Sequence, residues 1–362
     1  MTKKSFKNSI ILFSDDNNEP SWVKDYRLSA YKQIDEHNHP SFGPEIKLDI
    51  ELDNYLENKY IPFEVEGDGF IACDIHTAFN KYPGLMEKYY GKLIDSDENR
   101  YTVLNSTVFE SGYFIYVYKD QKLDFPIFNK NLNCDFSKNV IVVDENSELN
   151  VIDYCHTNSI FKSDCTEIFV EKGAKCRYLN INNNSSSSTI VSLKRARVEE
   201  YGSMDWINII EGSSIYMGYP STILKGKESN STSKTLAISS NKSSINVGAK
   251  MIHEGKMTKS NIENISCVKD SSEIEVRNAV NIHKNAINSS SIVSYSYSSE
   301  GNVSKYDNVP KYTVSNDGSN INFKVFNSME YEFNILKYIE DNFIPLSKIN
   351  KKYLQELIKG DK

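Results

Sequence analysis

Short runs in which apolar and polar residues alternate dominate the chain from Asn139 to about Val325. Val, Ile, Thr and Tyr occupy every second position in most of these runs, and Asn, Ser, Gly or Asp interrupts them every few residues. The clearest runs are VIVVD (140–144), TEIFVE (166–171), STIVSLK (188–194) and SIVSYSY (291–297). A period of two predicts strands with one buried face. No long amphipathic helix pattern separates the runs, which argues against alternating strands and helices.

Similar short polar turns recur between these runs. They begin at Glu145, Glu171, Glu200 and Glu211, and each follows one apolar run and precedes another. Their spacing is uneven, so no strict repeat family can be assigned. Loosely repeated strands with small turns favour a solenoid, in which stacked coils bury one continuous core. A β-sandwich or a barrel is the alternative.

Helical patterns lie outside this stretch. The first predicted helix begins near Ser21 as its N-cap and must end before Pro40. Asp74 is the expected N-cap of a second helix, and Pro83 fits the first turn of a third. From Tyr101 onward the pattern predicts strands. The apolar stripe of the first helix consists of Trp22, Tyr26, Ala30 and Ile34.

Two further helices are predicted at the C-terminus, the second beginning near Pro345 and Ser347. Apolar stripes at this spacing are usually core, and a partner-binding surface is the sharper interpretation. The resulting division is a helical or mixed region (1–100), a β core (101–326) and a C-terminal helical region (327–362). The expected partner-binding residues are Phe333, Leu336, Tyr338, Tyr353 and Leu354.

Charge and the lengths of the apolar runs argue against several classes of function. The 362 residues carry a net charge of −7 without a basic block, which gives no support to nucleic-acid binding. No run approaches 18 consecutive apolar residues, so no membrane span is expected. The apolar run near the N-terminus is too short for a secretory signal. These features predict a cytoplasmic protein with reduced thiols.

Familiar catalytic motifs are missing. The six cysteines form no C-x-x-C pair, and Gly226-Lys227 does not complete a phosphate-binding loop. His37 and His39 beside Pro40 suggest a metal site only weakly, since loop histidines are usually exposed. His253, like His156, could be a ligand or a base, although a lone histidine in a β-rich core is more often structural. A carbohydrate-cleaving solenoid would need acids gathered on one face.

Several segments, taken in order, carry a family resemblance. Residues 19–36 and 72–119 supply its N-terminal part. The core supplies YPS (219–221), LKG (224–226), GAKMIH (248–253) and VNIHK (280–284). Together they resemble the SufB/SufD family of iron–sulfur cluster assembly scaffold proteins over almost the whole chain.

This resemblance implies a right-handed parallel β-helix flanked by helical regions at both ends. It also implies a complex with SufC, an ABC-type ATPase, which docks on the C-terminal helices. Two SufB/SufD-type chains pair through their β-helices, and a transient iron–sulfur cluster forms at that interface. No intrinsic cofactor is expected.

The chain departs from the family where the cluster would be handled. The resemblance places a cysteine at Tyr295, a glutamate near Thr313, and a histidine near Asn322 or Phe323. Tyr, Thr and Phe are poor ligands for iron or sulfide compared with thiolate and imidazole. Cys267, His253 and His283 are the remaining candidate ligands.

We therefore expect a non-catalytic, SufD-like or degenerate SufB-like subunit that pairs with a paralogue or with itself. A β-solenoid enzyme acting on carbohydrate is one alternative, and three acids within about 10 Å of each other on the outer face would favour it. A purely structural interaction solenoid without an ATPase partner is the other.

Overall fold

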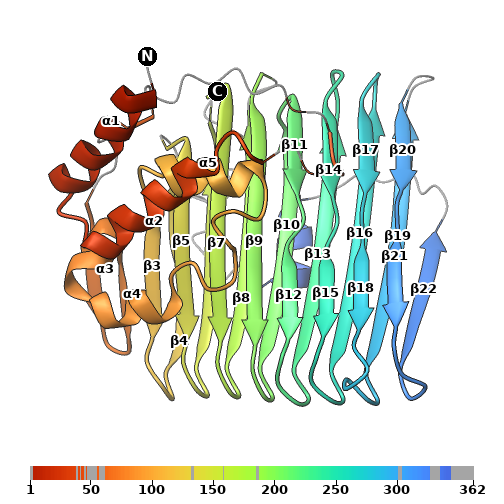
Figure 1. Ribbon diagram of the computed structural model, residues 1–362. Coiled ribbons are helices and arrows are strands. Elements are labelled where there is room, and N and C mark those ends of the chain that lie inside the picture. Colours follow the sequence, from red (N-terminus) through yellow and green to blue (C-terminus); the bar gives the residue numbers. More distant parts are fainter. Residues whose placement is uncertain are drawn as a thin grey trace.

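The computed structural model shows helices at the N-terminal end of a long parallel β-solenoid (Figure 1). It describes residues 3–37, 40, 42–44, 46, 55–56, 62–131, 134–157, 159–184, 187–300, 304–326 and 335–343. Within these residues, no helix is long and apolar enough to cross a membrane. The solenoid predicted from the alternating runs is thus confirmed, and the sandwich and barrel alternatives are wrong.

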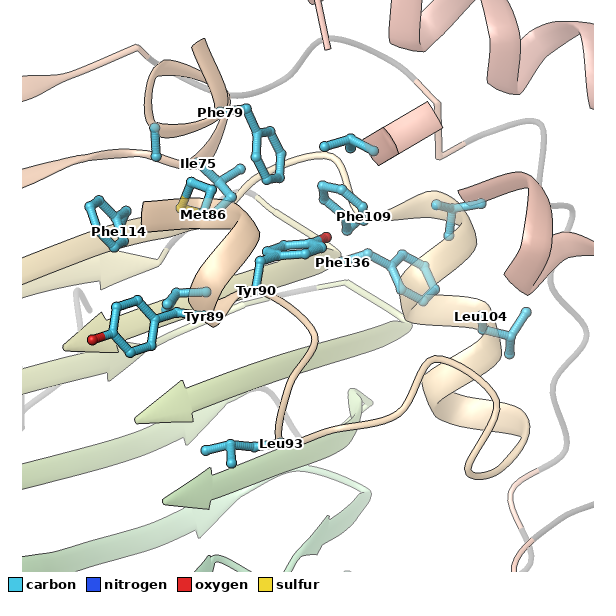
Figure 2. Close-up of a cluster of buried hydrophobic side chains, with 14 of the residues drawn as sticks. Ile75, Phe79, Met86, Tyr89, Tyr90, Leu93, Leu104, Phe109, Phe114 and Phe136 are labelled. Atoms are coloured by element: carbon cyan, nitrogen blue, oxygen red, sulfur yellow. The ribbon is translucent and has the colours of Figure 1, made fainter. Parts of the chain in front are cut away.

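Five helices belong to the N-terminal part: α1 (Lys3–Asp16), α2 (Ser21–Lys32), α3 (Ile75–Lys81), α4 (Pro83–Tyr89) and α5 (Arg100–Val108). An aromatic cluster fastens them to the first coils, and Figure 2 shows Phe79, Tyr90, Phe109 and Phe136 converging there. The rings of Phe79 and Tyr90 meet edge to face with centroids 5.1 Å apart. Such contacts favour one fixed arrangement of the rings.

The start signals of α3 and α4 are confirmed. Asp74 caps α3 by accepting a hydrogen bond from the Thr77 amide at 2.9 Å. Pro83 is the first residue of α4. The loop between α4 and α5 is held on the solenoid by Glu167, a buried carboxylate that accepts hydrogen bonds from the amides of Gly91 (2.7 Å) and Ile94 (2.9 Å).

Three expectations about the N-terminal part are wrong. Ser21 is the first residue of α2, and Pro20, not Ser21, is its N-cap. A helix, α1, precedes the one predicted at Ser21. The strands expected from Tyr101 begin later, because residues 100–108 form α5. Every residue from Tyr101 to Val108 is buried, so the helix has no polar face and shows no helical periodicity. Its β-branched residues therefore form a pattern that is typical of a strand.

The solenoid has two sheets, each built from one side of every coil (Figure 1). Sheet B contains, in order, β4 (Lys122–Asn131), β6 (Glu148–Cys155), β8 (Lys175–Asn184), β10 (Ser203–Gly212), β13 (Asn230–Ser239), β16 (Lys259–Lys269), β19 (Ser290–Glu300) and β22 (Asn320–Phe326). All its pairings are parallel.

Sheet A starts with β1 (Glu64–Gly67), β2 (Phe70–Asp74) and β3 (Tyr113–Val117), which pair antiparallel in that order. From β3 onward the pairing is parallel, with β5 (Phe136–Val143), β7 (Phe161–Val170) and β9 (Thr189–Val198). In later coils each strand divides into two short strands. These pairs are β11 (Ile215–Gly218) and β12 (Ser221–Leu224), β14 (Ser244–Val247) and β15 (Lys250–His253), β17 (Glu273–Val276) and β18 (Ala279–Ile282), and β20 (Lys305–Asn308) and β21 (Lys311–Val314).

Coil length explains why no strict repeat is visible in the sequence. The residues 148, 175, 203, 230, 259, 290 and 320 occupy one register position in sheet B, with intervals of 27 to 31 residues. The strands stay in register while the corners differ in length. Backbone pairing therefore does not require a constant repeat.

One C-terminal helix, α6 (Ile335–Asn342), lies on the outer face of sheet B. It packs on an apolar stripe of β6, β8 and β10, and Lys234 donates a hydrogen bond to Asn342 at 2.7 Å. The stripe consists of Ile152, Tyr154, Leu179, Ile181, Ile207 and Ile209. The second C-terminal helix, predicted from Pro345, lies outside the described residues.

Candidate functional site

The three candidate ligands are not brought together. His253 and His283 lie in successive coils of sheet A, where the His283 amide donates to the His253 carbonyl at 3.0 Å. Cys267 lies in sheet B, seven residues beyond Ser260, the hydroxyl partner of His253. At about 3.3 Å per strand residue, Cys267 is roughly 20 Å from that histidine. No shared ligand set results.

His253 is buried, and both ring nitrogens have hydroxyl partners. Nδ1 lies 2.8 Å from Thr258 Oγ1, and Nε2 lies 2.9 Å from Ser260 Oγ. Burial, followed by the nearby His283, lowers the pKa of His253 to about 4. At neutral pH the ring is uncharged and joins the turn after β15 to β16.

All six cysteines are buried thiols. Burial raises the pKa of Cys73, Cys134 and Cys165 to about 12 and that of Cys155 to about 11, and it also raises the pKa values of Cys176 and Cys267. The thiolate is the form that binds metal, so these sites disfavour ligation. Within the part of the chain that is described, no three His, Cys, Asp or Glu side chains form a metal-binding group.

The positions that depart from the family pattern gather in the last coils, where aromatic rings pack together. The buried Tyr295 shares a hydrogen bond with the Tyr312 hydroxyl. The Tyr312 ring stacks on Phe323 with centroids 6.5 Å apart. Burial, followed by the hydrogen bond to Tyr295, raises the pKa of Tyr312. Protonated phenols at this end are poor ligands for iron.

Thr313 and Asn322 are exposed on β21 and β22 of the same coil. The positions at which the resemblance implies ligands therefore lie in one region of the molecule, the C-terminal end of the solenoid. Tyr295, Thr313, Asn322 and Phe323 supply no thiolate, carboxylate or imidazole there.

In the part of the chain that the structure describes, this end of the solenoid is open. Phe323 pairs with the buried Val293, and Val325 pairs with the buried Tyr295, so both side chains continue inward-facing columns. They are nevertheless 68% and 61% exposed, because no further coil among the described residues covers them. Figure 1 shows β22 as the last strand at this end. Sequence reasoning missed this surface, because the apolar alternation of NINFKVF predicts a strand but does not indicate whether another coil covers it.

The other sheet edges carry features that discourage pairing. At the N-terminal edge of sheet B, β4 contains Pro126 and shifts register between Lys122 and Pro126. At the C-terminal edge of sheet A, Lys305 opens β20, and Pro310 and Lys311 stand at the start of β21. Proline, charge and irregular register are features that protect edge strands. The β22 edge has no proline and one lysine, Lys324, and it exposes the apolar side chains of Phe323, Val325 and Phe326.

The expected partner-binding residues fall into two groups. Leu336 and Tyr338 are half-buried in α6 and pack against the sheet-B stripe. The remaining three, Phe333, Tyr353 and Leu354, lie outside the described residues. The α6 contact thus holds residues 335–343 against the chain's own solenoid.

Three acids do line one hollow on the outer face of sheet A: Glu273, Glu275 and Asp307. Each has a partner, since Glu275 pairs with Arg277 (2.6 Å), Asp307 pairs with Lys305 (2.9 Å), and Glu273 accepts a hydrogen bond from a serine. The hollow measures about 180 Å³, below the roughly 300–1,000 Å³ typical of ligand pockets. It does not favour a carbohydrate site.

Two family profiles match the chain. The profile of the SufBD core domain of SUF-system iron–sulfur cluster assembly matches residues 127–324, and that of the SufBD N-terminal region matches residues 46–128. The core match alone spans more than half of the 362 residues.

Similar proteins carry related descriptions. An iron–sulfur cluster assembly SufBD family protein of Staphylococcus saprophyticus is 26% identical over 94% of this chain and 83% of its own length. A SufBD family protein of Staphylococcus haemolyticus is 30% identical, and the iron–sulfur cluster assembly protein SufB of Bacillus subtilis is 29% identical. Both of these matches cover 78% of this chain and 61% of the relative.

Proposed function

Because the chain belongs to the SufBD family of iron–sulfur cluster assembly proteins, we propose that it is a non-catalytic scaffold subunit. In this proposal it pairs with a second SufB/SufD-type chain through the open end of its solenoid. An ABC-type ATPase like SufC docks on its C-terminal segment, and a transient cluster forms at the interface between the two solenoids.

The uncovered apolar edge of β22 supports the pairing more than any other feature. Solenoids need terminal units with a polar outer face to remain soluble alone. Here Phe323 and Val325 extend inward-facing columns into solvent. A second chain placed against this edge would bury both side chains and satisfy the free backbone groups of β22.

The chemistry of the end face supports a partner of a particular kind. Tyr295, Tyr312 and Phe323 occupy this end, and the nearest candidate thiol, Cys267, is buried with a raised pKa. A cluster at the interface would then depend on ligands of the other chain. The proposed partner is a paralogue that carries cysteine, rather than a second copy.

The α6 contact bears on ATPase docking. Part of the surface of the Leu336 and Tyr338 side chains is already covered by the sheet-B stripe. The ATPase contact would therefore rest on Phe333, Tyr353 and Leu354, with α6 anchoring that segment to the solenoid.

The proposal is tested by purifying the tagged chain from its native cells, identifying co-purified proteins by mass spectrometry and recording an absorbance spectrum. Recovery of an ABC-type ATPase and a cysteine-bearing paralogue would support it. Recovery of the ATPase with a homodimer that shows cluster absorbance would contradict the non-liganding role. Absence of the ATPase would favour a purely structural interaction solenoid.

Replacing the two apolar side chains of the open end provides a direct test of pairing. We expect Phe323→Asp with Val325→Asp to abolish the pair, because the two carboxylates would be desolvated at the interface. Light scattering after size-exclusion chromatography measures the mass. Ile160→Asp is the matched control, since Ile160 is 82% exposed and lies away from this end. A pair that survives the double substitution would exclude this interface.

A second substitution tests the ligand assignment. We expect Cys267→Ser to leave cluster formation in the paired complex unchanged, because the Cys267 thiol is buried and hydrogen-bonds to Ser298 at 3.1 Å. Cluster content is measured from iron, sulfide and absorbance per complex. A loss of cluster in the variant with an intact pair would make Cys267 a ligand.

A further inference from the structure

A ladder of polar side chains runs through the interior of the solenoid along sheet B. Asn180, Asn208, Thr235 and Asn264 occupy the same register position in successive coils. Asn180 Nδ2 donates to Asn208 Oδ1, and Asn208 Nδ2 donates to Thr235 Oγ1, both at 3.4 Å. The next member, Asn264, does not continue the ladder.

Asn264 is buried without a hydrogen-bond partner. It is 1% exposed, and neither its amide nitrogen nor its amide oxygen has a partner among the described residues. The hydroxyls of Ser233 and Ser266 are in the same state, and both side chains are also 1% exposed. Buried amides and hydroxyls nearly always have hydrogen-bond partners, because losing water without compensation is costly.

These groups share one stretch of the interior. Ser266 lies two residues from Asn264 on β16, and Ser233 lies two residues from Thr235, the neighbour of Asn264 on β13. Residues two apart in a strand face the same side of a sheet. All of these side chains therefore point into the same coils.

The side chains of β13 that precede this level are small. Ser233 follows Trp206 in its column, and Ala237 follows Ile210 and precedes Ser266. The large side chains of the earlier coil are thus replaced by side chains of one or two heavy atoms.

The side chains that line this stretch of the interior favour an uncharged bound molecule over an ion. The inward-facing residues of β13 and β16 are Ser, Thr, Ala, Ile, Asn and Val, without a charged side chain. An ion would lack a counter-charge there, and its desolvation would not be compensated. Asn264 needs one donor and one acceptor, and water supplies both.

We propose that ordered water molecules occupy the interior of the solenoid at Asn264 and bridge its amide to the hydroxyls of Ser233 and Ser266. The water at this site supplies the hydrogen-bond partners that the polar ladder does not give to Asn264. Buried waters of this kind make about three hydrogen bonds each and form part of the folded structure.

A crystal structure of the full chain at high resolution tests the site directly. The expected result is density for at least one water within hydrogen-bonding distance of Asn264 Nδ2 or Oδ1 and of one of the two serine hydroxyls. An amide that instead bonds to protein groups, with no water beside it, would overturn the proposal.

Solution measurement on variants provides an independent test. Water-oxygen relaxation dispersion counts internal waters with long residence times. We expect Asn264→Leu, and separately Ser233→Ala with Ser266→Ala, to lose at least one such water relative to the wild type. Asn322→Leu is the control, because Asn322 is exposed on β22. An unchanged count in folded variants of both kinds would refute the site.

Discussion

Glu19 keeps its charge inside the N-terminal helical region because Arg27 lies against it. Arg27 donates from Nη2 to Glu19 Oε1 at 2.6 Å and from Nε to Oε2 at 2.8 Å, and both side chains are fully buried. Burial alone would raise the pKa of Glu19, but Arg27 and the hydrogen bond to His76 lower it to about 2. The guanidinium group also lies 3.4 Å from the centre of the Phe109 ring.

We expect Glu19→Gln to lower the free energy of unfolding by about 3–5 kcal/mol, because it leaves the Arg27 charge buried without a partner. In the wild type, the contribution of Glu19 is present above its unfolded pKa, near 4.5, and is lost as the pH falls toward 2. Denaturant unfolding at pH 7 and pH 3 measures both effects. Glu145→Gln at the exposed Lys119 pair is the control, with little change expected. Equal losses in the two variants would contradict this account.

One corner of each described coil except the last, where Gly318 stands, has a residue with positive φ. Asp120, Asn146, Gly173, Tyr201, Glu228, Met257 and Asn288 occupy this position. The Asn146 amide donates to the Lys172 carbonyl, the Gly173 amide to the Glu200 carbonyl, and the Tyr201 amide to the Lys227 carbonyl. The same turn is thus hydrogen-bonded from coil to coil, whichever side chain occupies it.

Substitutions of Gly173 and Tyr201 at this corner are expected to have different effects on the stability of the fold. Gly173→Ala should destabilise the fold by about 1–2 kcal/mol, since φ is +69° and the new Cβ would lie 2.6 Å from Asn146 Oδ1. Tyr201→Gly should leave the free energy of unfolding nearly unchanged or raise it, because φ is 60° and the side chain is half exposed. Thermal unfolding of the two variants provides the comparison. A Tyr201→Gly variant less stable than Gly173→Ala would show that the tyrosine side chain, not the backbone, dominates.

The sequence identifies elements that have a one-sided burial pattern and misses those that do not. β19, with the segment SIVSYSY, shows such a pattern, because serines separate Val293, Tyr295 and Tyr297, and this run is predicted as a strand. The helix α5 was predicted as strand, since none of its residues from Tyr101 to Val108 faces solvent. The end surface at Phe323 was also missed, because a strand's pattern does not indicate whether another coil follows it.

Among the described residues, helices cover the N-terminal end of the solenoid and nothing covers its C-terminal end. The aromatic cluster around Phe79 and Phe109 fastens the helices over the first coils, whereas β22 ends the described solenoid without a cover (Figures 1 and 2). In such a quasi-one-dimensional protein each coil is stabilised mainly by its neighbours. The last coil therefore has half of the usual support.

We expect amide hydrogen exchange to follow this gradient. In the isolated chain, β20–β22 should exchange fastest among the strands and β5–β8 slowest, because exchange reports local opening. Pairing should slow β22 and leave β5–β8 unchanged. Mass spectrometry of peptic fragments, with and without the partner, measures the rates. Equally slow exchange of β22 in the isolated chain would indicate that its edge is already protected.

The variable coil length has a practical consequence for engineering. Coils of 27 to 31 residues stack in the same register, so the extra residues are accommodated at corners rather than in strands. The corner between β13 and β14 contains Asn241 and Lys242, both exposed and both with positive φ. A short epitope tag or fluorophore-binding peptide inserted there would project sideways from the solenoid. Such an insertion would allow the protein to be captured or labelled without obstructing the helical end or the β22 edge.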